Sequence, residues 1–163
     1  MFYFSYGSNM DPRQILRRCP SSKFYSRAIL QDYKLDFTLK SRRRRCGVAN
    51  VIPCKTKKVV GVIYQIKSAR DWERLDSAEG FKEGRDAGNL YTRSLISTDA
   101  YDKKKPNLLA YIYIGLIENS PPPPSNLYLD QIIYGAQYWG LPSEYIQDII
   151  NMQKIRYKNH VKA

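Results

Sequence analysis

The first twelve residues, MFYFSYGSNMDP, constrain the fold more than any other stretch of this chain. Residues 1–6 are apolar and mostly aromatic, which predicts a buried strand. Gly7 permits a tight turn, and Asp11 with Pro12 is a typical N-cap and first helical residue, so we expect a short helix to about Arg18. The backbone N–H groups that follow Gly7 would then face outward at a turn, where they can bind an anion or a developing oxyanion.

The rest of the chain predicts strands first and most helices later. Strands are expected over residues 24–39 (one long strand or two broken ones), 47–52, 59–66, 90–97 and 108–116, with a basic turn at residues 53–58. Helices are expected over residues 68–78, 125–139 and 143–156, and a rigid polyproline crossover at residues 121–124. This order favours the α+β class: a small mixed β-barrel-like sheet with helices packed outside. At 163 residues we expect one domain, residues 1–163.

The chain is strongly basic, with 27 Lys and Arg against 15 Asp and Glu and a net charge of +12. The basic residues gather in runs that look like turns: Lys40 with Arg42, Arg43, Arg44 and Arg45, then Lys55, Lys57 and Lys58, then residues 103–105. Such runs are usually a solvated edge, and the two functional alternatives are contact with nucleic acid and recognition of an anionic small substrate.

Two features of the sequence bear on location. No stretch approaches the roughly 20 apolar residues of a membrane helix. The opening MFYFSYGSNM has no basic region and no cleavage-like site. We therefore expect a cytoplasmic protein without a signal peptide or a membrane partner.

Cysteine, histidine and metal chemistry is not expected. Cys19, Cys46 and Cys54 are odd in number and form no CxxC pair, which argues against a disulfide framework or a zinc site. The single histidine, His160, lies near the C-terminus, so a Cys–His nucleophile is not favoured either. We expect no metal and no cofactor.

Glu79 is the strongest candidate for a catalytic group among the acidic residues. It lies between Ala78 and Gly80 and is followed by Phe81, and these small and aromatic neighbours indicate partial burial. Burial raises the pKa of a carboxyl group and suits it to proton transfer near neutral pH. The nearby acids are expected to be solvated: Asp71, Glu73, Asp76, Glu83 and Asp86.

An ordered set of short motifs covers nearly the whole chain. The motifs are YFSYGSNM (3–10), LQDYKLDF (30–37), GVIY (61–64), LDSAEGF (75–81), Tyr111 in a late strand, SPPP (120–123), GA (135–136) and GLPSEY (140–145). No single motif is decisive, but in this order and spacing the chain resembles the γ-glutamylcyclotransferase family and its AIG2-like fold.

The resemblance implies a mixed α+β barrel that cyclises a γ-glutamyl amide. The α-amine of the substrate would attack its own γ-carbonyl, forming 5-oxoproline and releasing an amine or amino acid. Such an intramolecular attack already has a high effective molarity. The resemblance places this transferase or lyase in glutathione metabolism and requires no cofactor.

The resemblance also implies roles for individual residues. Glu79 would be the general base and then the acid that protonates the departing amine. Tyr111 would add a hydroxyl contact. The γ-glutamyl group would be held, mainly through backbone amides, by Tyr3, Phe4, Ser5, Tyr6, Gly7, Ser8 and Asn9.

Two segments depart from the family pattern and keep alternatives open. The run of arginines at residues 42–45 is not expected in the family, and residues 82–89 are longer than the expected link. Both could border the mouth of the site. One alternative is a nucleic-acid-binding module that reuses the fold, and another is a cyclotransferase for a larger γ-glutamyl-tagged metabolite. The sequence leaves the departing amine and the oligomeric state open.

Overall fold

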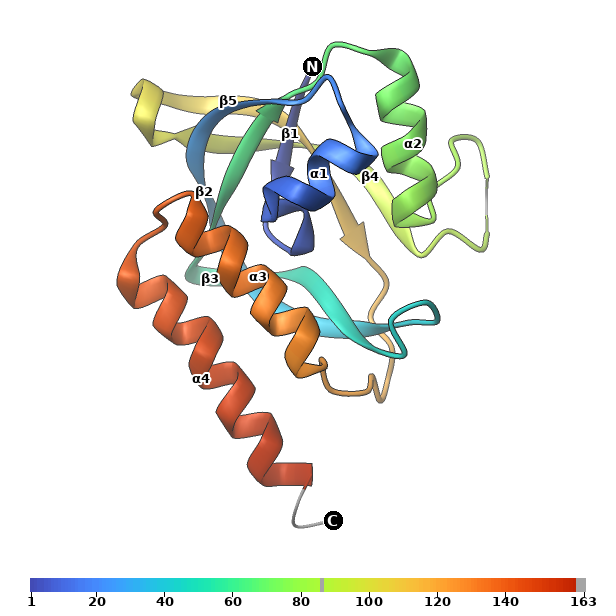
Figure 1. The fold of residues 1–163 in the computed structure, drawn as a ribbon, viewed down its shortest axis with the longest axis vertical. Coiled ribbons are helices and arrows are strands. Elements are labelled where there is room, and N and C mark those ends of the chain that lie inside the picture. Colours follow the sequence, from blue (N-terminus) through green and yellow to red (C-terminus); the bar gives the residue numbers. More distant parts are fainter. Residues whose placement is uncertain (86, 161–163) are drawn as a thin grey trace.

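A ring of hydrogen-bonded strands is the centre of the fold (Figure 1). The structure is a computed structural model that describes residues 1–85 and 87–160, and the side chains of the last helix as far as Met152. In that part of the chain the strands follow the ring order β1-β3-β2-β4-β5. Their bounds are β1 Phe2–Ser5, β2 Lys23–Ser41, β3 Cys46–Gln65, β4 Tyr91–Ala100 and β5 Lys105–Gly115.

The ring has two long antiparallel strand pairs, which are joined to each other by shorter strand pairings on two sides. β2 pairs with β3, and β4 pairs with β5, along most of their lengths. β1 closes the ring by pairing antiparallel with β3 and parallel with β5, where Tyr3 lies opposite Tyr111. On the other side, β2 meets β4 only at Ala28 and Ile29. The predicted α+β class with a barrel-like sheet is confirmed.

One predicted turn is wrong. Residues 53–58 were expected to separate two strands, but β3 continues through them against the same partner strand. The register shifts here because the segment 54–57 bulges opposite Asp32, which has a φ of 60° and accepts a hydrogen bond from the Thr56 N–H at 3.1 Å. The exposed basic residues of this bulge interrupt the apolar pattern of the strand, and that interruption resembles a turn.

The helices cover the outside of the ring (Figure 1). The short 3-10 turns are η1 Ser8–Met10 and η2 Tyr101–Lys103, and the α-helices are α1 Pro12–Arg18, α2 Ala69–Glu79, α3 Asn126–Tyr138 and α4 Ser143–His160. Of the helices in the described residues, none combines the length and apolarity that a membrane crossing requires. The side chains of Ile155 and His160, both in α4, lie outside the described part.

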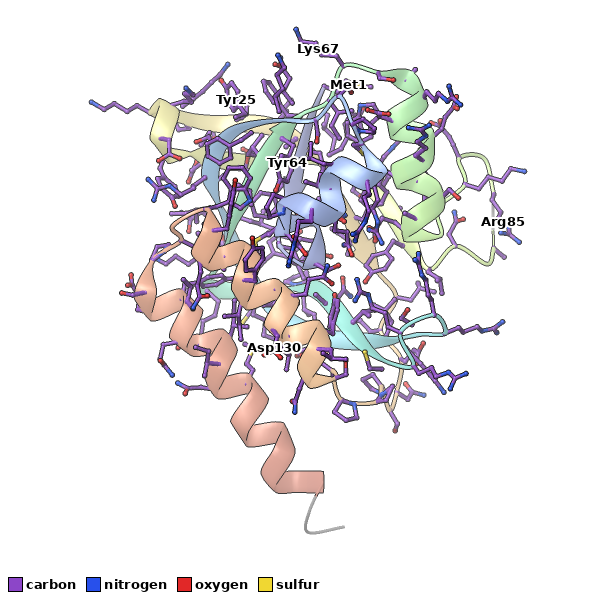
Figure 2. All side chains as sticks on the ribbon, in the orientation of Figure 1. Met1, Tyr25, Tyr64, Lys67, Arg85 and Asp130 are labelled. Carbon is purple, nitrogen blue, oxygen red and sulfur yellow. The ribbon has the colours of Figure 1, made fainter. Side chains whose placement is uncertain are left out.

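The core consists of aromatic and branched side chains from the strands, closed by the helices. Phe4, Phe37 and Tyr64 are among its largest fully buried members, and the Tyr64 ring (labelled in Figure 2) packs against Trp139 at the end of α3. Cys19 and Cys46 are buried free thiols. This packing ties β1 to the helices around it, so the turn that follows β1 has a fixed position.

Candidate active site

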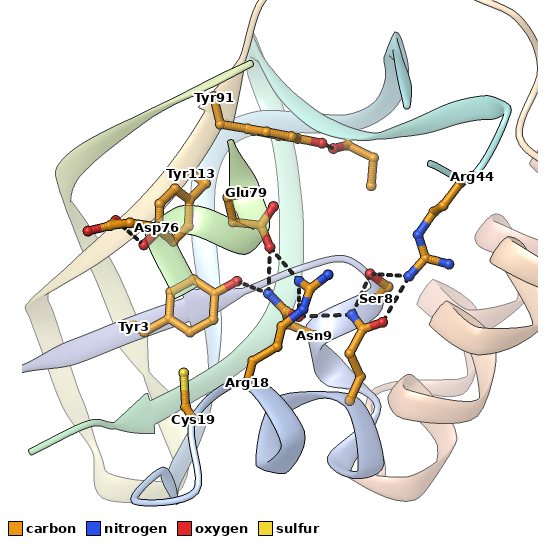
Figure 3. A network of polar contacts seen from close by, with 12 residues as sticks. Tyr3, Ser8, Asn9, Arg18, Cys19, Arg44, Asp76, Glu79, Tyr91 and Tyr113 are labelled. Carbon is orange, nitrogen blue, oxygen red and sulfur yellow. Dashed lines mark hydrogen bonds and ion pairs between the residues drawn. The ribbon is translucent and has the colours of Figure 1, made fainter. Parts of the chain in front are cut away.

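The turn that follows β1 meets the C-terminal end of α2 (Figure 3). The Ser68 side chain caps the start of α2, and Gly80 ends it in the left-handed conformation, with a φ of 65°. Glu79 is the last residue of this helix, and Asn9 lies in η1. The Asn9 Nδ2 donates a hydrogen bond to Glu79 Oε1 at 2.9 Å, although 70 residues separate them in the chain.

Asn9 uses the whole hydrogen-bonding capacity of its amide. The Nδ2 also donates to the Tyr3 hydroxyl at 2.8 Å, while the Oδ1 accepts from Arg18 at 2.7 Å and from Gln14 at 2.9 Å. A primary amide has two donor hydrogens and two acceptor lone pairs, so the orientation of the side chain is fully determined. Asn9 thereby links Glu79 to β1 and to α1.

Arg18 adds an ion pair to the same carboxylate oxygen. Its Nη1 lies 2.7 Å from Glu79 Oε1, and the two side chains are 18% and 15% exposed. Both polar contacts therefore fall on Oε1, and no described residue donates a hydrogen bond to Oε2. One carboxylate oxygen is held in place and the other is free to exchange a proton.

The pKa of Glu79 is raised above its usual value. Burial is the largest cause, because it disfavours the charged carboxylate. The positive charge of Arg18 and the hydrogen bonds from Asn9 and Arg18 act in the opposite direction, with a smaller contribution from Arg44. A carboxyl group with a raised pKa is suited to accept and return a proton.

Glu79 lies between two cavities. The larger has a volume of about 690 Å³ and opens beside the turn between β2 and β3. The smaller, of about 30 Å³, is lined by Tyr3, Tyr6, Gly7, Ser8, Asn9, Ala49, Glu79, Tyr91, Tyr113 and Tyr128. The larger volume lies within the range of roughly 300–1,000 Å³ that is typical of small-molecule sites.

Gly7 allows the chain to pass close to the smaller cavity. Its φ of −120° is not left-handed, so the requirement for glycine is steric. An added Cβ would lie 3.2 Å from the Ala49 Cβ and 3.7 Å from the Tyr128 hydroxyl. Since the first amides of a helical turn have no acceptor within that turn, the N–H groups of Ser8 and Asn9 are available at this point.

The structure brings together most, but not all, of the residues expected to bind substrate. Tyr3, Tyr6, Gly7, Ser8 and Asn9 line the smaller cavity together with Glu79. The Phe4 side chain is fully buried in the core, and the Ser5 hydroxyl is buried without a hydrogen-bond partner among the described residues. Neither Phe4 nor Ser5 is among the described residues that line the two cavities.

Tyr111 is not among the described residues that line the two cavities. Its ring packs 5.3 Å from Trp72, and the Arg93 guanidinium lies 5.3 Å from its centre. Tyr113, two residues later on β5, lines the smaller cavity instead. The Tyr113 hydroxyl donates to Asp76 Oδ1 at 2.6 Å.

Two acidic residues that were expected to be solvated are not. Asp71 is 4% exposed, and its carboxylate accepts the Ser21 N–H at 2.7 Å. Asp76 is partly buried and pairs with Arg93 at 2.7 Å in addition to its bond with Tyr113. Asp76 precedes Glu79 by nearly one helical turn, and this spacing was the only sequence signal that placed it near the site.

Arg44 links the basic turn between β2 and β3 to the site (Figure 3). It donates to Gln14 Oε1 at 2.8 Å and to the Ser8 Oγ at 3.4 Å, and its guanidinium lies 4.6 Å above the Tyr128 ring. No sequence pattern distinguishes this arginine from its neighbours in the run. Arg18 and Gln14 were also not anticipated, because contacts between distant segments become visible only in the fold.

The long link after α2 touches the larger cavity at its two ends. Gly80 and Leu90 line that cavity, and the Leu90 N–H donates to the Gly80 carbonyl at 3.1 Å. Within the link, the Asn89 side chain bonds the Lys82 backbone in both directions, at 2.9 and 3.1 Å. Arg85 projects away from the ring (Figure 2). Asp86, which was expected to be solvated, lies outside the described residues.

Known proteins resemble this chain in both sequence and fold. A family model described as gamma-glutamyl cyclotransferase, AIG2-like, matches residues 3–130. Gamma-glutamylcyclotransferases of Bos taurus and Homo sapiens are 31% and 30% identical over 163 residues, covering 98% of this chain and 82% of each relative. A solved gamma-glutamyl cyclotransferase structure gives a TM-score of 0.80 at 27% identity, covering 97% of this chain and 98% of that one. The chain belongs to the gamma-glutamyl cyclotransferase, AIG2-like family, and the resemblance is confirmed.

Proposed function

We propose that this protein is an enzyme, a γ-glutamyl cyclotransferase that converts a γ-glutamyl amide into 5-oxoproline and a free amine. The observation that carries the proposal is the position of Glu79, held through Oε1 by Asn9 and Arg18 between two cavities, next to the turn that follows β1. Family membership supports the same activity.

In the proposed reaction, Glu79 first accepts a proton from the α-ammonium group of the substrate. The freed amine attacks the γ-carbonyl carbon, so a ring C–N bond forms and the carbonyl oxygen gains negative charge. Glu79 then returns the proton to the amide nitrogen, the original C–N bond breaks, and the amine departs. The ring nitrogen gives up its second proton, by way of Glu79, to the released amine, which becomes an ammonium ion. Atoms and protons then balance without water, and the raised pKa of Glu79 suits these transfers.

The turn at Gly7, Ser8 and Asn9 supports the proposed binding of the γ-glutamyl group. The turn and Glu79 line the same cavity, and N–H groups of the turn that face this cavity would stabilise the oxyanion as it forms. The aromatic walls of the smaller cavity, including Tyr3 and Tyr113, would exclude water from the reacting atoms. The larger cavity would hold the part of the substrate that departs.

The test is release of 5-oxoproline from a panel of γ-glutamyl conjugates by the wild-type protein and by Glu79→Gln. We expect the variant to lose at least about a hundredfold in kcat, because the amide cannot carry the proton, while it remains folded. Glu73→Gln is the matched control, since Glu73 is exposed on the same helix. Full activity of Glu79→Gln would overturn the proposed mechanism.

The nucleic-acid alternative predicts a different result. The basic residues fall into separate places: Arg42, Arg43 and Arg44 line the cavity beside Glu79, and the bulge at residues 54–57 does not. Binding to nucleic acid would weaken steeply with salt, because phosphate contacts release counterions. The alternative of a larger γ-glutamyl metabolite is covered by the same conjugate panel.

A further inference from the structure

The larger cavity beside Glu79 has an unbalanced charge. The described residues that line it include one carboxylate, that of Glu79. They also include six cationic side chains, which are Arg17, Arg18, Lys40, Arg42, Arg43 and Arg44. These six come from two elements, α1 and the end of β2 with the turn that follows it, so the charge faces the cavity from two sides.

Two of the six cations already have partners within the site. Arg18 pairs with Glu79 at 2.7 Å. Arg44 bonds only neutral groups in the described part of the chain, Gln14 and Ser8, and packs over the Tyr128 ring. These contacts fix the two guanidinium groups, and they bring the basic turn between β2 and β3 against the site.

The other four cations have no such partner. Arg17, Lys40, Arg42 and Arg43 form no ion pair with any acidic side chain that the structure describes. All four are exposed. Like charges gathered around one cavity repel one another within a Debye length, about 8 Å at physiological salt, and a bound anion relieves this repulsion. The packing of the fold does not account for their placement.

The position of the larger cavity relative to Glu79 indicates which part of a substrate would contact these charges. Glu79 and Ser8 line both cavities, whereas Tyr3, Gly7 and Asn9 line only the smaller one. The ring-forming atoms must lie at Glu79, next to the turn. The group attached to the amide nitrogen must then extend into the larger cavity, toward Arg42 and Arg43.

We propose that the amine released by this enzyme carries two or more anionic groups, carboxylate or phosphate, that bind Arg17, Lys40, Arg42 and Arg43. This inference rests on the cyclotransferase function proposed above. A guanidinium group binds one carboxylate or phosphate in a bidentate pair, so a single acidic group would leave most of the four cations unmatched. The same charges repel a conjugate whose departing amine is a diamine or a lysine.

The first experiment compares kcat/KM for 5-oxoproline release from γ-glutamyl conjugates of glycine, glutamate, O-phosphoserine and the lysine ε-amine. We expect the glutamate and phosphoserine conjugates to be the best substrates and the lysine conjugate the worst. The ratio between the two acidic conjugates tells whether the site prefers carboxylate or phosphate. The advantage of the acidic conjugates over the glycine conjugate should fall as salt rises from 0.05 to about 0.5 M, since salt screens exposed charges.

The second experiment compares Arg42→Gln/Arg43→Gln with Lys57→Gln/Lys58→Gln. Each double variant removes two exposed positive charges, but Lys57 and Lys58 belong to β3 away from the cavity lining. We expect the cavity variant to lower the ratio of kcat/KM for the glutamate conjugate over the glycine conjugate by roughly tenfold, because each exposed pair contributes up to about fivefold. The control should leave this ratio unchanged, and thermal unfolding verifies that both variants are folded.

The outcomes separate the two proposals. Equal kcat/KM values for the glycine and glutamate conjugates, or a preference for the lysine conjugate, would overturn the proposal that the departing amine is anionic. Neither result would contradict the cyclotransferase function. An equal loss of the ratio in both double variants also overturns the anionic amine, because net charge alone would then explain the effect. No 5-oxoproline from any conjugate overturns the cyclotransferase function, and this inference with it.

Discussion

The Asn9 amide and the Glu79 carboxylate are joined by a 2.9 Å hydrogen bond that connects the turn after β1 to the end of α2. The same amide bonds Tyr3, Gln14 and Arg18, so it is the point at which β1, α1 and α2 meet. The position of Glu79 therefore depends on Asn9 and Arg18, which precede it by 70 and 61 residues in the chain.

Replacing Asn9 with alanine should reduce activity more than stability. The change leaves Glu79 with only Arg18 and removes the link to Tyr3, so the carboxylate loses its fixed orientation. We expect kcat/KM for 5-oxoproline release to fall by at least about tenfold, and the free energy of unfolding by about 1–3 kcal/mol, the cost of unsatisfied buried partners. Asn89→Ala, in the link after α2, is the control, because its amide contacts only that link in the described residues. A variant with normal kcat/KM would show that Asn9 does not orient Glu79.

Replacing Arg18 with glutamine should move the acid limb of the pH–activity profile to higher pH. Glu79 must be ionised to accept a proton, and its pKa is already raised by burial. Arg18 opposes that rise, so its removal raises the pKa further and activity is lost at a higher pH than in the wild type. The measurement is kcat/KM between about pH 4 and pH 9, and Arg70→Gln, which removes an exposed charge from α2, is the control. A limb that stayed in place would contradict the role given to Arg18.

The raised pKa of Glu79 also predicts how stability varies with pH. A carboxyl whose pKa is higher in the folded protein keeps its proton longer there than in the unfolded chain. Its contribution to stability is therefore greatest below the ordinary carboxyl pKa and declines as pH rises through the raised value. The difference in unfolding free energy between wild type and Glu79→Gln should decline over this window, as measured by urea unfolding. A difference that grew with pH would mean that Arg18 and Asn9 outweigh burial.

Local patterns in the sequence were enough to predict the class of fold and several element ends. Ser68 and Gly80 define the limits of α2 through local hydrogen bonds and a left-handed φ, which short-range chemistry determines. The bulge in β3 was mistaken for a turn because pairing with β2 on both sides of it is a long-range property.

The candidate site was predicted only in part for the same reason. Gly7 and Glu79 were found because each has a local signature, a turn glycine and an acid among small neighbours. Arg18 and Arg44 lack such a signature, since only their contacts with Glu79 and Gln14 distinguish them from other arginines. The family match indicated Tyr111, whereas the strand register brings Tyr113 to the cavity.

Asp76 should be important for stability, while its neighbour Glu83 should not. Asp76 bonds Tyr113 at 2.6 Å and Arg93 at 2.7 Å, and the Arg93 guanidinium lies against the rings of Trp72 and Phe81. Asp76→Asn removes the closer and more buried charge partner of this mostly buried guanidinium, and we expect a loss of about 2–3 kcal/mol in unfolding free energy. This corresponds to a decrease in Tm of roughly 4–12 °C for a chain of this size.

Glu83→Gln is the matched control for this prediction. Glu83 lies 3.6 Å from the same Arg93, but its side chain is 84% exposed. An exposed pair contributes little in high dielectric, so Tm should change by no more than about 2 °C. Equal Tm decreases in the two variants would show that net charge, and not the partly buried pair with Asp76, stabilises this region.

Replacing Gly135 with alanine should disturb the active site, although Gly135 itself does not line either cavity. Gly135 lies where α3 crosses η1, and an added Cβ would lie 2.5 Å from the Met10 carbonyl carbon and 2.7 Å from the Asp11 nitrogen. Both are backbone atoms, so either α3 or the turn that positions Asn9 must move. Alanine stabilises a helix by about 1 kcal/mol relative to glycine, so a loss of stability in this variant must have a steric cause. We expect the free energy of unfolding, measured by chemical denaturation, to fall by about 1–3 kcal/mol, and kcat/KM to fall as well. Gln137→Ala, at an exposed position of the same helix, should leave both unchanged. A Gly135→Ala protein as active and stable as wild type would show that the contact between α3 and η1 does not position the site.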